Sequence, residues 1–167
     1  MNQVIEAIRT RRSVRKFTDA PVSAEDLSAI LEAGRWAPSG LNNQPWRFAV
    51  IRDGEVLERL SRLTRYGPVV RGSTLCVAVF YHAPSGYNRD KDILGIGACI
   101  QNMLLAAHSL GIGAVWLGEI LNQKSAVNGL LGLDASYELM AVLALGSPDE
   151  RPESERRPID ELVVGSV

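Results

Sequence analysis

The segment of residues 92–110 constrains the fold of this chain more than any other part of it. Its length and apolar spacing predict a helix, and Gly111 suits the left-handed conformation that ends many helices. Apolar residues occupy most sides of this helix, so it must lie deep inside the molecule. Gln101, Asn102 and His108 interrupt the apolar run, which therefore indicates a buried helix rather than a membrane span.

Shorter patterns around this helix predict further helices and strands in mixed order. The predicted helices cover residues 4–10, 24–34, 54–63 and 123–131, and the last three follow the capping residues Ser23, Asp53 and Asn122. Gly132 is expected to close the last of them. The predicted strands cover residues 48–51, 74–81, 114–117 and 138–145. Because few strand–helix–strand units repeat, this order predicts an α+β fold rather than a doubly wound sheet.

Length and charge limit the organisation and the partners of the chain. Its 167 residues fit one domain over residues 1–167. With 18 basic and 19 acidic residues the formal charge is -1, so we expect neither nucleic acid nor a membrane as a partner. The polar N-terminus lacks the apolar core of a signal peptide, and the expected location is the cytoplasm.

Cysteine and histidine usage argues against metal and nucleophile chemistry. Cys76 and Cys99 each lie in an apolar run and are predicted to be buried thiols. His82 and His108 are far apart and match no metal-ligand spacing, so no metal site is expected. The sequence also lacks a P-loop, a nucleophile elbow and a dinucleotide fingerprint.

Two arginine-rich segments are candidates for binding an anion. Residues 11–15 read Arg-Arg-Ser-Val-Arg, and in an extended chain Arg11, Ser13 and Arg15 point one way and Arg12 the other. Guanidinium groups match phosphate oxygens, so this segment is a plausible phosphate clamp, with a solvated basic turn as the alternative. Near the other end, Arg156 and Arg157 could reach an anion or form a solvated charge run.

Two further segments permit close contact with a ligand. The loop of residues 37–46 combines rigid prolines with small residues and amides, which suits a planar heterocycle, although a tight connector is equally compatible. The glycines of residues 111–119 allow backbone to approach a ligand, but core packing is the simpler interpretation there. Beyond Ser147 the chain is polar until Ile159, Leu162 and Val163, so residues 147–167 are predicted to dock on a partner subunit.

Taken together and in this order, these segments resemble the nitroreductase family of FMN-dependent oxidoreductases. The likeness covers nearly the whole chain and comprises the segments RRSVR, APSGLNNQPW, GACIQNMLLAAHSLGIG, AVWLG and RRPI. It implies an α+β fold with a mixed central sheet flanked by helices. It also implies a homodimer with two FMN molecules at the interface between the subunits.

The resemblance also implies which residues hold the cofactor. The phosphate and ribityl contacts correspond to Arg11, Arg12, Ser13 and Arg15. The residues implied to reach the flavin of the other subunit are Pro38, Ser39, Gly40 and Asn42. The residues implied to line the isoalloxazine are Trp116, Leu117, Gly118 and Glu119. Arg156 or Arg157 would return to the phosphate, and Arg65 and Arg71 are candidates for one more polar contact.

The implied reaction uses NADH or NADPH to reduce the flavin. An electron-poor acceptor, such as a nitroaromatic or a quinone, would then enter the same site in a ping-pong scheme. Because the flavin carries the redox chemistry, no catalytic side chain is expected. The alternatives are another flavin enzyme on this scaffold, which destroys flavin, dehalogenates or oxidises azolines, and a non-catalytic flavin-binding protein.

Overall fold

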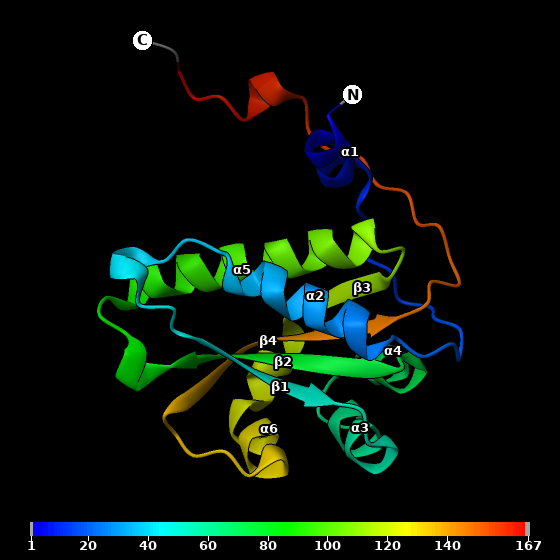
Figure 1. Ribbon diagram of the computed structural model, residues 1–167, viewed down its shortest axis with the longest axis vertical. Coiled ribbons are helices and arrows are strands. Elements are labelled where there is room, and N and C mark those ends of the chain that lie inside the picture. Colours follow the sequence, from blue (N-terminus) through cyan, green and yellow to red (C-terminus); the bar gives the residue numbers. More distant parts are fainter. Residues whose placement is uncertain (1, 166–167) are drawn as a thin grey trace.

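A four-stranded sheet separates two layers of helices in the computed structural model, which describes residues 2–165 (Figure 1). The strands, in their spatial order, are β1 (Trp46–Ile51), β2 (Leu75–His82), β4 (Tyr137–Gly146) and β3 (Gly113–Leu117). All three pairings are antiparallel, so the expectation of a mixed sheet is wrong for the described chain. The reason is that β4 inserts between β2 and β3 and runs against both of them.

Helices cover both faces of this sheet. One face carries α2 (Ala24–Arg35) and α5 (Arg89–Ser109), with α1 (Gln3–Thr10) beyond α5 (Figure 1). The other face carries α3 (Gly54–Ser61), α4 (Gly67–Gly72) and α6 (Lys124–Leu131). Short 3-10 turns lie at Gly40–Asn42, Ala83–Ser85, Glu119–Gln123 and Ile159–Glu161. This arrangement confirms the predicted α+β fold.

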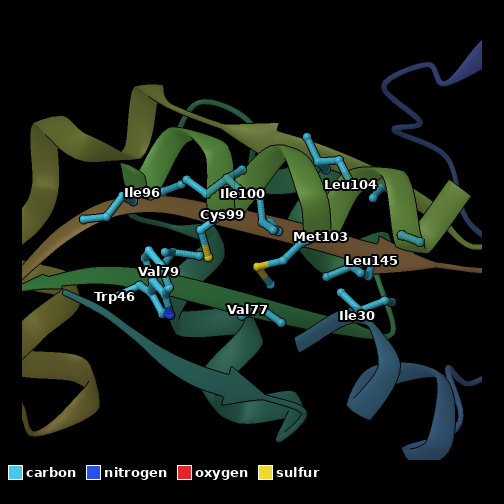
Figure 2. Close-up of a cluster of buried hydrophobic side chains, with 14 of the residues drawn as sticks. Ile30, Trp46, Val77, Val79, Ile96, Cys99, Ile100, Met103, Leu104 and Leu145 are labelled. Atoms are coloured by element: carbon cyan, nitrogen blue, oxygen red, sulfur yellow. The ribbon is translucent and has the colours of Figure 1, made fainter. Parts of the chain in front are cut away.

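The long helix α5 is buried as its sequence predicts. In Figure 2 its side chains Ile96, Cys99, Ile100 and Met103 face the sheet, where they belong to one cluster with residues of β2 and α2. The helix begins three residues earlier than predicted, because the Asn88 side chain accepts a hydrogen bond from the Lys91 N–H at 3.1 Å. Its end is as expected, with Gly111 at a φ of 75°.

The predicted helix ends are mostly confirmed. Ser23 Oγ accepts from the Asp26 N–H at 2.9 Å, and Asp53 caps α3 in the same way. The prediction for Asn122 is wrong, because this residue lies inside the turn Glu119–Gln123 and α6 begins only at Lys124. The sequence pattern missed α4, a six-residue helix without a side-chain cap whose formation depends on the burial of its two valines.

Within residues 2–165 no helix is both long and apolar enough to cross a membrane. Over the same residues, no group of three or more histidine, cysteine, aspartate or glutamate side chains is placed to hold a metal ion.

Both thiols are fully buried, which predicts that they are inert in the folded protein. Burial raises the pKa of Cys76 and that of Cys99 to about 12 each. Because the thiolate is the reactive form, dithionitrobenzoate should label neither thiol at neutral pH in the native protein. Both should react in concentrated guanidinium, and rapid labelling of the native protein would contradict the buried placement.

Candidate functional site

The arginine-rich segment after α1 is fixed along the edge of the sheet. The Val14 N–H donates to the Ala114 carbonyl of β3 at 3.0 Å, and the Thr18 N–H donates to the Ser147 carbonyl at 2.9 Å. The Val14 side chain is buried. These contacts hold residues 11–18 in place against β3, so the segment is not a freely solvated turn.

Positive charges gather at this edge without carboxylate partners. The Nε atom of Arg11 is buried and has no hydrogen-bond partner. Burial lowers the pKa of Arg11, and the nearby cations Arg156 and Arg12 lower it further. Among residues 2–165, the ion pairs within 4.0 Å include none of the guanidiniums of Arg11, Arg12, Arg15 and Arg156. A half-buried cation whose buried Nε has no acceptor is costly, so this arrangement favours a bound anion.

The tail closes a cavity of about 260 Å³ over these arginines. Its polar lining comprises Arg11, Arg12, Ser13 and Arg15 from the first segment and Glu153, Ser154 and Arg156 from the tail. The Arg156 guanidinium is steadied by Ser154 Oγ at 3.0 Å and by the Glu155 carbonyl at 2.8 Å. Arg157 is exposed and does not line the cavity, so the fold brings only one of the two tail arginines to the cluster.

Arg12 behaves differently from its neighbours. Its Nη1 atom donates to the carbonyls of Arg9 at 2.7 Å and Arg11 at 3.0 Å, so its side chain turns back toward the end of α1. This matches the alternation of side chains along an extended segment. Arg12 still lines the cavity with the other three residues predicted in this segment, but its Nη1 donors are already used by the main chain.

The predicted residues at the end of β3 lie on the same edge of the sheet. Trp116 is 41% exposed and Leu117 is buried, while Gly118 and Glu119 begin the following turn. From Ala114 to Gly118 the extended chain covers about 13 Å. Because β3 is the last strand of the sheet, its outer edge offers backbone groups to a ligand near the arginine cluster.

The side chain of Glu119 has a structural partner of its own. Its Oε2 atom accepts from Thr64 Oγ1 at 2.6 Å and from the Arg65 N–H at 3.1 Å, and these bonds lower the pKa of the carboxyl. The Arg65 guanidinium pairs with the same carboxylate at 3.5 Å. The other candidate for an additional contact, Arg71, donates to Ser61 Oγ at 2.9 Å. These contacts tie the segment between α3 and α4 to the turn after β3, and they tie α4 to the end of α3.

The loop before β1 has an unusual backbone. Leu41, Asn42 and Gln44 have φ angles of 54°, 54° and 47°, a region that is strained for residues other than glycine. A Cβ atom on Gly40 would collide with the Tyr87 hydroxyl, so a larger residue there would force the exposed Tyr87 side chain to move. Strain of this kind persists only where the surroundings determine the conformation.

Asp92 supplies that support, a role that no pattern in the sequence indicates. The residue is fully buried in the first turns of α5. Its carboxylate accepts from Asn43 Nδ2 at 2.7 Å and from the N–H groups of Tyr87 at 3.0 Å and Asn88 at 3.2 Å. Burial alone would raise the pKa of Asp92, but these hydrogen bonds outweigh it and hold the pKa below its ordinary value.

The strained loop and the arginine cluster lie at opposite ends of α5. Pro38 and Ser39 pack against Gly95 near the start of the helix. Near its end, His108 Nε2 lies 2.8 Å from Thr10 Oγ1, directly before the arginine segment. Thirteen residues of helix separate Gly95 from His108, a rise of about 20 Å. The chain thus joins the arginines to the end of β3 and keeps Pro38, Ser39, Gly40 and Asn42 apart from them.

Comparison with known proteins identifies the family. The sequence model of the nitroreductase family matches residues 8–68 and 64–147, which together span most of the chain. This chain belongs to the nitroreductase family. A relative from Archaeoglobus fulgidus, named NADH dehydrogenase/NAD(P)H nitroreductase, is 35% identical over 92% of this chain and 90% of its own length.

Solved structures of nitroreductase-fold proteins agree with the fold. A nitroreductase from Desulfovibrio desulfuricans in complex with FMN has a TM-score of 0.97 and 49% identity, covering 100% of this chain and 98% of the other. The NADPH:FMN oxidoreductase of Vibrio harveyi, solved with NAD+, has a TM-score of 0.90 and 28% identity, covering 99% of this chain and 78% of the other.

The anchoring role of Asp92 predicts a loss of stability in the Asp92→Asn variant. The new amide cannot accept all the buried donors as a carboxylate does, so the free energy of unfolding should fall by about 1–3 kcal/mol. Because the pKa of Asp92 is lowered on folding, its contribution is present near neutral pH and is lost as the pH falls below about 4.

Denaturant unfolding at neutral and at acidic pH measures both effects. The matched control is Asp90→Asn on the exposed side of the same helical turn, which should unfold like the parent protein. The anchoring role is wrong if the two variants unfold at the same denaturant concentration and respond equally to acid.

Proposed function

We propose that this chain is an FMN-dependent oxidoreductase that uses NADH or NADPH to reduce electron-poor acceptors such as nitroaromatics or quinones. The observation that carries the proposal is the buried, unpartnered Arg11 Nε within a group of guanidiniums that form no ion pair among the described residues. Support comes from the FMN complex of a relative that is 49% identical over the whole chain.

The arginine cluster fits the phosphate of FMN. A phosphate ester brings nearly two negative charges, which the guanidiniums of Arg11, Arg15 and Arg156 can match, with Ser13 as a further donor. An oxygen of the phosphate would give Arg11 Nε the acceptor that it lacks. Arg12 would contribute its charge from the reverse side of the segment.

The end of β3 suits the isoalloxazine ring. Trp116, Leu117, Gly118 and Glu119 lie on the same sheet edge as the phosphate cradle, so one molecule can reach both in one subunit. The open edge provides backbone groups, and Glu119 contributes its main chain because its carboxylate holds residues 64 and 65. Bound FMN supplies the electron transfer, so the side chains need only bind, orient and exclude water.

A homodimer would complete the site. The loop with Pro38, Ser39, Gly40 and Asn42 lies near the first turns of α5, away from the arginine cluster. We therefore propose that these four residues contact the flavin of the partner subunit. The surface also favours a second subunit, since α1 buries none of its residues and Val4 and Ile8 are 63% and 49% exposed. Exposed apolar area of this kind is typical of an interface.

The tail is the second element proposed to bind the partner. In Figure 1 the chain beyond β4 runs past the arginine segment and then away from the sheet, toward α1. Its apolar residues Ile159, Leu162 and Val163 are 74%, 58% and 55% exposed. We propose that residues 147–167 dock on the other subunit, although residues 166 and 167 lie outside the described part of the chain.

NAD(P)H and the acceptor would use the exposed face of the flavin in turn, which is a ping-pong scheme. Purified protein should therefore be yellow, lose its flavin absorbance on anaerobic addition of NAD(P)H, and regain it with a quinone. Light scattering should give twice the 18.2 kDa chain mass. Protein that takes up no FMN would refute the proposal. Bound flavin that NAD(P)H cannot bleach would favour flavin binding without turnover, and consumed flavin would favour flavin destruction.

The two tail arginines provide a matched pair for the phosphate cradle. Arg156→Ala removes a charge-assisted hydrogen bond of about 1.5–3 kcal/mol and should weaken FMN binding by about tenfold or more. Arg157→Ala removes the same group from a position outside the cavity and should leave FMN affinity nearly unchanged. Fluorescence titration of apoprotein with FMN measures both, and equal effects would contradict the assignment of Arg156.

A further inference from the structure

A second cavity lies on the reverse side of the arginine segment. Its volume is about 460 Å³, within the range of small-molecule sites. Arg11, Arg12 and Val14 line it, and Arg11 and Arg12 also line the proposed phosphate cradle, whereas Ser13, Arg15 and Arg156 line the cradle alone. Val14 thus lines only the second cavity and Ser13 and Arg15 line only the cradle, as alternate side chains of an extended segment do.

The floor of this second cavity is apolar. Leu104 from α5, Ile112 and Ala114 form it together with Val14, and three of these four side chains are buried. Such a surface favours the apolar body of an organic molecule over a hydrated inorganic ion.

The rim carries cations whose donors are not all used. The Nη1 atom of Arg12 donates to two carbonyls, and its other guanidinium nitrogens make no hydrogen bond among the described residues. Arg151, an exposed residue of the tail, takes part in no ion pair within residues 2–165. Two guanidiniums therefore face the opening of the cavity with donors to spare.

The remaining polar groups of the rim set the net charge. Glu150 is the one carboxylate in the lining, and it accepts from the Arg15 N–H at 2.6 Å. Thr10 donates its hydroxyl hydrogen to the Glu6 carbonyl, so it accepts from His108 Nε2, a bond that a neutral imidazole can make. The guanidiniums of Arg11, Arg12 and Arg151 outnumber this one carboxylate, so the lining keeps an excess of positive charge that favours an anion.

We propose that this cavity binds a small organic acid, with one carboxylate on an apolar body, at a site separate from the flavin. The carboxylate would lie between Arg12 and Arg151, and the body would pack on Leu104, Ile112 and Val14. The charge argument rests on the proposed function, because Arg11 and Arg12 also serve the phosphate there, whereas the shape and the floor of the cavity do not depend on it.

Calorimetric titration of the FMN-loaded protein with cyclohexanecarboxylate tests the proposal, since this probe is not planar and stacks poorly on a flavin. We expect saturable binding of the acid, and an affinity for the neutral cyclohexanecarboxamide that is weaker by about tenfold or more. Arg151→Gln should weaken binding of the acid by about tenfold through loss of a charge-assisted contact. Arg59→Gln, an exposed arginine on the opposite face, is the matched control and should bind like the parent.

Three results would overturn the proposal: no binding of the acid, equal binding of the amide, or binding that Arg151→Gln leaves unchanged. FMN content and melting temperature of the Arg151→Gln protein should equal those of the parent, because this exposed residue makes no hydrogen bond within residues 2–165. The same titration on protein without FMN separates the two proposals. Binding that depends on Arg151 there supports the cavity even if the protein takes up no flavin.

Discussion

The need to remove α5 from water organises the whole molecule. Eight of its residues are buried, and they require a sheet on one side and α2 beside them to form a continuous apolar cluster. This helix also separates the two groups of candidate ligand residues. The strained loop rests on its beginning and the arginine segment lies beside its end. A rigid buried helix therefore fixes the distance between the two parts of the proposed site.

Several arginines lie close together along the edge of the sheet that β3 forms. Main-chain hydrogen bonds from Val14 and Thr18 hold the arginine segment on the sheet edge, and the tail adds Arg156 to it. Burial and, to a smaller extent, the neighbouring cations Arg156 and Arg12 lower the pKa of Arg11, so the charged form of this side chain is destabilised in the free chain. A bound phosphate would attract the guanidiniums that repel one another in its absence. The arginine cluster, which lowers stability without the ligand, would therefore supply affinity for the phosphate.

The loop before β1 likewise gives up stability in a segment that is proposed to contact a ligand. Three residues other than glycine adopt positive φ angles there, and a buried carboxylate on another element holds them. Asp92 satisfies backbone and side-chain donors at once, which makes the loop conformation a consequence of how α5 begins. Residues that approach the partner's flavin would thus be positioned by a group that never touches it.

Sequence alone determined the burial of α5, most helix caps, the buried thiols and the order of the family's segments, because periodicity and capping are local properties. It did not determine that β4 lies between β2 and β3, that α4 forms, or that α6 begins after Asn122. It also left Arg156 and Arg157 equivalent and gave no role to Asp92. Only the tertiary structure decided these points, because each depends on groups far apart in the chain meeting at one place.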